Sequence, residues 1–220
     1  MNSNTETVAT SSRSGTVEFS RRRLFSLIGL IPLGLFVVFH LLNVSSAWSG
    51  PEAFDAAIEA GHRSWVSWLG TVFILAFVAY HSWVGIMLML KATPFSPPPR
   101  RLGHWQYILQ RISAVGILLF IPAHVIKAKI LPALGGTHET FAGMHHAFAE
   151  DPMSALTLIV YLLGTLGVAY HLSNGLWTGF TSLGIARGAR AQKRVMYFSM
   201  GFFVFLLVLA YGTIAVLFRG

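Results

Sequence analysis

Five apolar stretches, each long enough to cross a bilayer, constrain this chain more than any other feature of its sequence. A transmembrane helix needs about 20 consecutive, mostly apolar residues. The stretches cover Leu24–Ser46, Trp65–Leu90, Trp105–Ile126, Met153–Ser182 and Val195–Phe218. Because backbone polar groups in lipid must be satisfied within the segment that crosses it, these stretches predict helices. We therefore expect an all-α membrane protein, a bundle of five transmembrane helices.

Composition indicates how the rest of the chain is organised around this bundle. Of the 220 residues, 54% are hydrophobic and 11% are charged, which is far from the composition of a soluble domain. The connecting segments are short, so residues 20–220 are expected to form a single transmembrane domain. The Ser/Thr-rich residues 1–19 are expected to form a disordered polar tail. The first apolar stretch is longer than the core of a secretory signal, so we expect it to be retained.

The basic residues gather on one side of the predicted bundle. They precede the first stretch or lie in the second and fourth connections: Arg13, Arg21, Arg22, Arg23, Lys91, Arg100, Arg101, Arg187, Arg190, Lys193 and Arg194. The opposite side carries Arg63, Lys127, Lys129 and Arg219 together with Glu52, Asp55, Glu59, Glu139, Glu150 and Asp151. The positive-inside rule then predicts a cytoplasmic N-terminus and a C-terminus outside. The net charge of +8 thus indicates orientation in a lipid bilayer rather than binding to nucleic acid.

Four of the apolar stretches each contain one histidine: His40, His81, His124 and His171. An ionisable side chain at membrane depth is costly and usually functional, and neutral imidazole is a common ligand of haem iron. At about 1.5 Å per residue, His40 and His124 fall toward the outer face, and His81 and His171 toward the cytoplasm. Two layers with two imidazoles each predict two stacked haem b groups. Because both axial positions of each iron would be filled, the predicted chemistry is electron transfer.

Other uses of these histidines stay open. They could be hydrogen-bonded helix contacts, part of a metal-transport pathway or the proton relay of a transporter. Metal-transport sites usually enlist carboxylates, and no Asp or Glu lies within a stretch. A proton relay needs a polar pathway at the midplane, which these Leu- and Phe-rich stretches lack. The chain has no cysteine, which excludes c-type haem attachment and iron–sulfur clusters of its own. The remaining histidines lie in loops or at stretch ends, where an exposed imidazole is ordinary: His62, His104, His138, His145 and His146. The adjacent pair His145–His146 stays open as a metal or pocket site.

An internal repeat surrounds two of the four histidines. The pattern V-A-Y-H-x-x-x-G occurs at Val78–Gly85 and at Val168–Gly175, and it places a glycine on the same helix face as each histidine. Gly164 and Gly167 extend that face in the fourth stretch. The missing side chains would leave space for a flat macrocycle or allow helices to approach closely.

Further contacts of a haem and a quinone can be sought near each layer. Ser26 and Arg111, at the cytoplasmic ends of the first and third stretches, are candidates to bind haem propionates, although a snorkelling arginine explains Arg111 equally well. A quinone that is reduced needs a hydrogen-bond donor and a proton source. Asn43 and Glu59 lie at the depth of the outer pair and are candidates for a quinone site, although interfacial solvation also explains both.

Several motifs together resemble the succinate dehydrogenase cytochrome b558 subunit family. They are, in chain order, Arg22–Gly29 leading to Phe39-His40, Gly50–Asp55, Leu109–Ser113 before His124, and His171–Trp177. The resemblance extends from about residue 20 to residue 217. It implies a five-helix membrane anchor with two b-type haems. In this family His81 and His171 would hold the haem proximal to the soluble subunits, and His40 and His124 would hold the distal haem.

The resemblance also implies partners and an activity. A flavoprotein and an iron–sulfur protein would dock on the basic cytoplasmic face, and electrons would pass through the proximal and then the distal haem to a quinone, often menaquinone. The chain would be the membrane subunit of a succinate:quinone oxidoreductase (respiratory complex II) in a bacterial inner membrane. It would carry electron transfer and quinone chemistry but not succinate oxidation. The resemblance also allows a higher oligomer of the complex.

One position departs from part of the family. Relatives that reduce fumarate and carry a proton pathway have a glutamate two residues before the fourth-stretch histidine, where this chain has Ala169. The resemblance therefore favours succinate oxidation. The alternative is a di-haem cytochrome b of a hydrogenase, formate dehydrogenase or nitrate reductase. One histidine in each of the first four stretches favours the succinate dehydrogenase family.

Overall fold

The structure is a computed structural model that describes residues 24–62, 65–91 and 101–220. These residues form helices joined by short turns, and no strand occurs among them. Five helical segments are long and apolar enough to cross a membrane, which confirms the predicted fold class. They are Leu24–Ser49, Trp68–Lys91, His104–Leu134, Ser154–Ser182 and Ala189–Arg219. The polar tail expected over residues 1–19 lies outside the described part of the chain.

Several of these segments are composite. After a helical turn over residues 24–28, the elements are η1 (Gly29–Leu33), α2 (Gly34–Val44), η2 (Ser45–Ser49), α3 (Pro51–His62), α4 (Trp65–Lys91), α5 (Arg101–Val125), η3 (Ile126–Ile130), α6 (Leu131–Leu134), α7 (Phe141–His145), η4 (His146–Glu150), α8 (Ser154–Ser182) and α9 (Ala189–Arg219). Pro32 lies inside η1, a π-helical turn. Such a turn accommodates a residue that has no N–H to donate within an otherwise helical segment.

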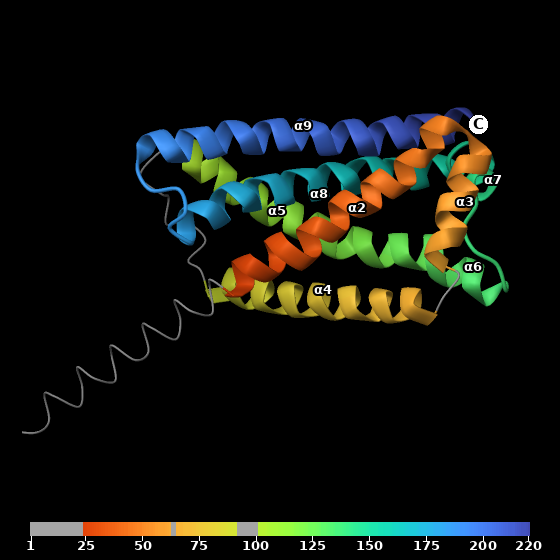
Figure 1. Ribbon diagram of the computed structural model, residues 1–220, viewed down its shortest axis with the longest axis horizontal. Coiled ribbons are helices and arrows are strands. Elements are labelled where there is room, and N and C mark those ends of the chain that lie inside the picture. Colours follow the sequence, from red (N-terminus) through yellow and green to blue (C-terminus); the bar gives the residue numbers. More distant parts are fainter. Residues whose placement is uncertain (1–23, 63–64, 92–100) are drawn as a thin grey trace, which may run out of the picture.

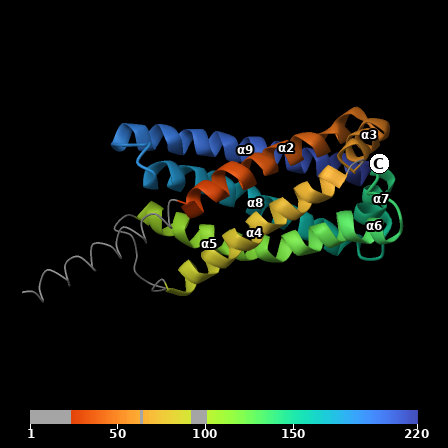
Figure 2. The ribbon, with the colours of Figure 1, turned by 60° about the horizontal axis from the view of Figure 1, so that its bottom comes forward.

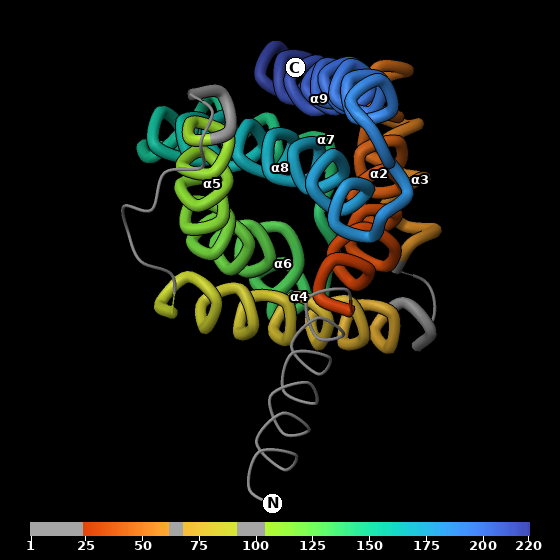
Figure 3. The backbone as a smooth tube through the Cα atoms, turned by 90° about the vertical axis from the view of Figure 1, so that its left-hand side faces the viewer, coloured from red at the N-terminus to blue at the C-terminus, as the bar shows by residue number. Residues whose placement is uncertain are grey.

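Helix α8 is the centre of the bundle. It packs along α5 on one side and along α9 on another, while α2 contacts α9 and η1 contacts α8. Helix α4 lies on the side of the bundle opposite α9 (Figures 1 and 3) and contacts the other described elements mainly through η1 and α3. A third of the most apolar window of α9 is buried, whereas none of the corresponding window of α4 is. The bundle is therefore tight around α8 and open along α4.

The two ends of the bundle differ in charge. We call the end formed by α3, α6, α7 and the C-terminus the acidic end (Figures 1 and 2); it carries Glu52, Asp55, Glu59, Glu139, Glu150 and Asp151. We call the opposite end, where α4 and α8 end and α5 and α9 begin, the basic end; it carries Lys91, Arg187, Arg190, Lys193 and Arg194. This separation of charge is the pattern on which the predicted orientation rests, with the basic end in the cytoplasm.

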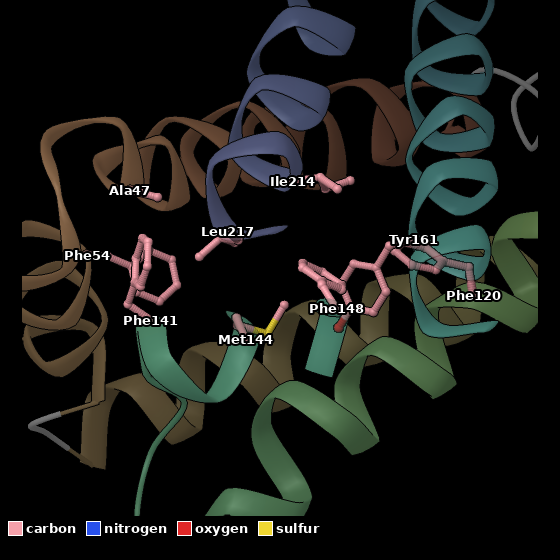
Figure 4. Close-up of a cluster of buried hydrophobic side chains, with 9 residues drawn as sticks. All are labelled: Ala47, Phe54, Phe120, Phe141, Met144, Phe148, Tyr161, Ile214 and Leu217. Atoms are coloured by element: carbon pink, nitrogen blue, oxygen red, sulfur yellow. The ribbon is translucent and has the colours of Figure 1, made fainter. Parts of the chain in front are cut away.

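A buried apolar cluster holds the acidic end together (Figure 4). It joins η2, α3, α7 and η4 to the ends of α5, α8 and α9, and consists of Ala47, Phe54, Phe120, Phe141, Met144, Phe148, Tyr161, Ile214 and Leu217. Aromatic rings meet edge to face within it, as in the contact of Phe148 with Tyr161 at 4.9 Å between ring centroids. The connections at this end therefore form a packed cap rather than loose loops.

The motif Gly50–Asp55 has a structural explanation within this cap. Gly50 has a φ of 110°, which favours glycine, and Pro51 begins α3. The buried Phe54 meets the ring of Phe141 at 6.0 Å between centroids. Asp55 Oδ1 accepts a hydrogen bond of 2.7 Å from the backbone N–H of Phe141. The motif thus connects α3 to the start of α7.

We expect Asp55→Ala to destabilise the folded chain by about 1–3 kcal/mol, because the Phe141 N–H would lose its partner in a partly buried place. Asp55→Asn keeps an oxygen that can accept the bond and should cost less. Thermal unfolding of the detergent-purified protein measures the effect. Glu52→Ala is the control, because Glu52 is an exposed carboxylate on the same helix. Equal melting temperatures for Asp55→Ala and Glu52→Ala would exclude a stabilising role for this bond.

Candidate functional site

The structure brings the four membrane-depth histidines together in two pairs. The rings of His40 on α2 and His124 on α5 are 5.7 Å apart between centroids, with an interplanar angle of 67°. The rings of His81 on α4 and His171 on α8 are 6.2 Å apart, with an angle of 85°. This is the pairing that follows from the depth of each histidine in the sequence. Binding of haem by these residues stays a prediction.

The two pairs lie in separate layers along the bundle. Ser113, which contacts His171, lies eleven residues before His124 on α5, or about 16 Å along the helix axis. Tyr161, which contacts His124, lies ten residues before His171 on α8, or about 15 Å. The distances along α5 and α8 therefore give nearly the same separation between the two layers. His40 and His124 form the acidic-end pair, and His81 and His171 form the basic-end pair.

His171 is held by hydrogen bonds to α5. Its Nδ1 lies 3.3 Å from the backbone carbonyl oxygen of Gln110 and 3.3 Å from the hydroxyl of Ser113. The side chain of Gln110 accepts a hydrogen bond of 2.8 Å from Asn174 Nδ2 and donates one of 3.2 Å to the backbone carbonyl of His171. The motifs Leu109–Ser113 and His171–Trp177, separate in the sequence, therefore contact each other.

The sequence motifs contain these residues, but they do not predict that Gln110 and Ser113 contact His171 and Asn174. The available signal was the presence of three uncharged polar side chains, Gln110, Ser113 and Asn174, within apolar stretches. Such side chains are expected to find partners across a helix interface in lipid. Which partners they find depends on the rotation of α5 against α8, and no sequence pattern gives that rotation.

His81 is held by packing. Its ring stacks on that of Phe25 with 4.3 Å between centroids and an interplanar angle of 7°. Its Nδ1 is buried and has no hydrogen-bond partner among the described residues. A Cβ added to Gly29 would lie 2.7 Å from Cε1 of His81, so a larger residue there would displace the ring. Gly29, the first residue of the π-helical turn η1, thus leaves room for the imidazole.

The acidic-end pair lies among aromatic side chains. His124 Nδ1 is 3.2 Å from the hydroxyl of Tyr161, and its ring stacks on that of Phe120 at 5.5 Å between centroids. His40 stacks on Phe36 at 5.5 Å with nearly parallel planes. Phe120 and Tyr161 also belong to the buried cap (Figure 4), which ties the orientation of His124 to the packing of the acidic end.

The glycines near the histidines serve close helix packing. A Cβ on Gly164 would overlap the ring of Phe120, and one on Gly167 would meet α5 at the carbonyl oxygen of Ser113, 3.7 Å away. The sequence suggests two roles for these glycines, close helix packing and space for a macrocycle. The structure shows the first, the close approach of α8 to α5. The other role, space for a macrocycle, stays a prediction.

The remaining candidates occupy less distinctive surroundings. Arg111 places its guanidinium 4.1 Å from the ring centroid of Tyr107 on its own helix, and Ser26 is half-buried near the start of the first span. Asn43 on α2 and Glu59 on α3 are exposed at the acidic end. Their roles in propionate and quinone binding stay predictions.

The histidines of the acidic-end connections show no metal cluster. His145 Nδ1 donates to the carbonyl oxygen of Leu217 at 3.0 Å, and its Nε2 lies 3.5 Å from the carboxylate of Glu150. His146 is exposed. Within the described ranges, no group of three or more His, Cys, Asp or Glu side chains could hold a metal ion. These contacts indicate that His145 helps to seat the end of α9.

Glu139 is a partly buried carboxylate just before α7. It accepts a hydrogen bond of 3.2 Å from the backbone N–H of Thr140. Burial raises the pKa of Glu139 above its ordinary value of 4.5, although the Thr140 N–H and the positive charges of Lys127 and His138 act in the opposite direction. The fold therefore favours the protonated form of this carboxyl group.

This raised pKa predicts a pH dependence of stability. The folded chain holds the Glu139 proton to a higher pH than the unfolded chain does. Stability therefore falls as the pH rises from about 4.5, the pKa in the unfolded chain, through the higher pKa in the folded chain. Glu139→Gln keeps an oxygen for Thr140 and removes the charge. We expect it to raise the melting temperature at neutral pH and to leave it nearly unchanged in acid. Equal shifts at both pH values, or a shift matched by Glu52→Gln, would count against this assignment.

Comparison with known proteins gives two matches. A family model described as the succinate dehydrogenase/fumarate reductase transmembrane subunit matches residues 91–211. The chain is also 30% identical over 194 residues to the succinate dehydrogenase cytochrome b558 subunit of Bacillus subtilis (strain 168), covering 88% of this chain and 94% of that relative. No solved structure shows a significant match.

Proposed function

Since the chain belongs to the succinate dehydrogenase/fumarate reductase transmembrane subunit family, we propose that it is the di-haem cytochrome b anchor of a succinate:quinone oxidoreductase. At the family level it is a multi-pass membrane subunit of an oxidoreductase complex. The observation that carries the finer proposal is the pairing of His40 with His124 and of His81 with His171 in two layers.

The two pairs fit haem better than a bare metal ion. An imidazole nitrogen binds a first-row metal ion at about 2 Å, so the ring centroids of two imidazoles on one ion lie at most about 6 Å apart. The observed separations are 5.7 Å and 6.2 Å. Each pair supplies two ligands, and no larger ligand group occurs among the described residues. In our proposal, a macrocycle would supply the remaining ligands of an iron held here.

The chain's own residues would hold and shield the two groups. His40 and His124 would ligate the distal haem, with Tyr161 and Phe120 orienting His124. His81 and His171 would ligate the proximal haem. When bound, haem would supply a one-electron couple, and two histidine ligands on each iron would leave no open position for oxygen. Ser26 and Arg111 are the proposed propionate partners.

The charge pattern supports a direction for the electron path. With the basic end in the cytoplasm, the flavoprotein and iron–sulfur subunits would dock there, next to the basic-end pair. The quinone, in our proposal menaquinone, would then be reduced beside the acidic-end pair, with Asn43 and Glu59 as candidate contacts. Family membership disfavours the hydrogenase, formate dehydrogenase, nitrate reductase and transporter alternatives. The buried Ala169 stands where fumarate-reducing relatives with a proton pathway have a glutamate. We therefore propose that the complex works in the direction of succinate oxidation.

Deletion of the gene for this chain in its host organism tests the proposal. We expect the flavoprotein and iron–sulfur subunits to move to the soluble fraction and succinate-dependent quinone reduction to be lost. Succinate oxidation with an artificial acceptor should persist, because that chemistry belongs to the soluble subunits. Membrane fractionation and the two assays measure these effects, with plasmid-borne wild-type chain as the control. Retention of the dehydrogenase and of quinone reduction in deleted membranes would overturn the proposal.

A further inference from the structure

The hydrogen bonds of His171 fix which ring nitrogen carries its proton. The backbone carbonyl of Gln110 can only accept, and it lies 3.3 Å from Nδ1. The Ser113 hydroxyl donates its proton to the same carbonyl at 3.0 Å, so its oxygen is left to accept from Nδ1–H at 3.3 Å. Both partners therefore require a proton on Nδ1. The lone pair of His171 is left on Nε2.

The side chains of Gln110 and Asn174 keep that carbonyl in place. Gln110 donates to the backbone of His171 while the His171 ring faces the backbone of Gln110, so the two residues are joined twice. Asn174 Nδ2 donates to the other end of the Gln110 amide at 2.8 Å. Asn174 and Ser113 are 8% and 7% exposed. These contacts fix the rotation of α8 against α5 at the level of His171.

Resting on the proposed function, we infer that Gln110, Ser113 and Asn174 are positioning residues that hold His171 as the Nδ1–H tautomer and lower the redox potential of the basic-end haem. A histidine that donates its second N–H to a carbonyl is a more basic ligand. A more basic ligand favours oxidised iron. Within the described residues, His81 Nδ1 has no hydrogen-bond partner, and His124 faces a tyrosine hydroxyl, which can donate as well as accept.

The test compares three variants with a matched control in the purified complex. Gln110→Met and Asn174→Leu remove the amide contacts at similar volume, and Ser113→Ala removes one hydroxyl. Thr181→Val is the control, because the Thr181 hydroxyl bonds to carbonyls of its own helix. Redox titration followed by the haem α-band gives the midpoint potentials, and electron paramagnetic resonance gives the low-spin signal of each haem.

We expect the basic-end haem of Gln110→Met to shift upward by about 59 mV, a tenfold change for a one-electron couple, with a changed resonance signal. The acidic-end haem and Thr181→Val should match the wild type. Because Gln110 and Asn174 share one hydrogen bond, a double variant that combines Gln110→Met with Asn174→Leu should shift little further than either single variant. Selective loss of the basic-end haem would also support the inference. If the larger substitutions prevent assembly of the complex, the smaller change Ser113→Ala is the deciding variant.

Two results would count against different parts of the account. Two haems with unchanged potentials and signals in all three variants would overturn the positioning role and leave the proposed function intact. Absence of haem from the wild-type complex would overturn the proposed function itself.

Discussion

His124→Ala is expected to remove the acidic-end haem and to abolish quinone reduction by the assembled complex. The imidazole of His124 is one of two side chains proposed to hold that iron, and His40, with its ring 5.7 Å away, would have no second imidazole to complete the site. The haem content should fall from two per chain to one. Quinone reductase activity should fall to background, because electrons would no longer reach the acidic end.

Two measurements keep this result specific. Succinate oxidation with an artificial acceptor should stay at the wild-type level, since it needs only the soluble subunits. His40→Ala should reproduce His124→Ala, and His146→Ala, which changes an exposed histidine at the same end, should leave both haems and both activities unchanged. Quinone reduction that survives loss of one haem would show that electrons leave the chain by another route.

Gly164→Ala is expected to have the largest effect of any glycine-to-alanine substitution in the described part of the chain. Its Cβ would overlap the ring of Phe120, which is buried and stacks on His124. Relief requires either rotation of Phe120 away from His124 or separation of α8 from α5. Overpacking of this kind costs about 1–3 kcal/mol. We expect a lower melting temperature and selective loss of the acidic-end haem.

A matched control lies on the facing helix. A Cβ on Gly116 of α5 would meet nothing within 4 Å, so Gly116→Ala should be neutral or slightly stabilising, as alanine usually is in a helix. Phe120→Leu, which shortens the side chain in the way, should partly restore haem binding to Gly164→Ala. If both alanine variants bind the acidic-end haem equally well, the packing of α8 against Phe120 does not control the site.

The spans and the histidine pairs could be predicted from the sequence because they depend on quantities that the sequence fixes directly. The length and hydropathy of each stretch determine where a helix can cross a bilayer. The rise per residue then gives the depth of each histidine, and depth alone groups His40 with His124 and His81 with His171.

The contacts around each pair could not be predicted in the same way. The bonds from Gln110 to His171 and Asn174 depend on how α5 is rotated against α8, and helix periodicity does not report this angle. The sequence does not predict that Gly164 faces Phe120, because this contact also depends on the rotation of α8 against α5. The sequence gives only the depth of Asn43 and Glu59, and depth does not determine whether a side chain is exposed.

The most direct test of the account is a haem count on the purified complex. Pyridine haemochrome quantification against protein, combined with reduced-minus-oxidised spectra with and without carbon monoxide, measures both the number of haems and their ligation. We predict two haems b per chain and no spectral shift with carbon monoxide, because two histidines would hold each iron and leave no open position. A chain without haem, or a carbon monoxide shift in the haem spectrum, would contradict it.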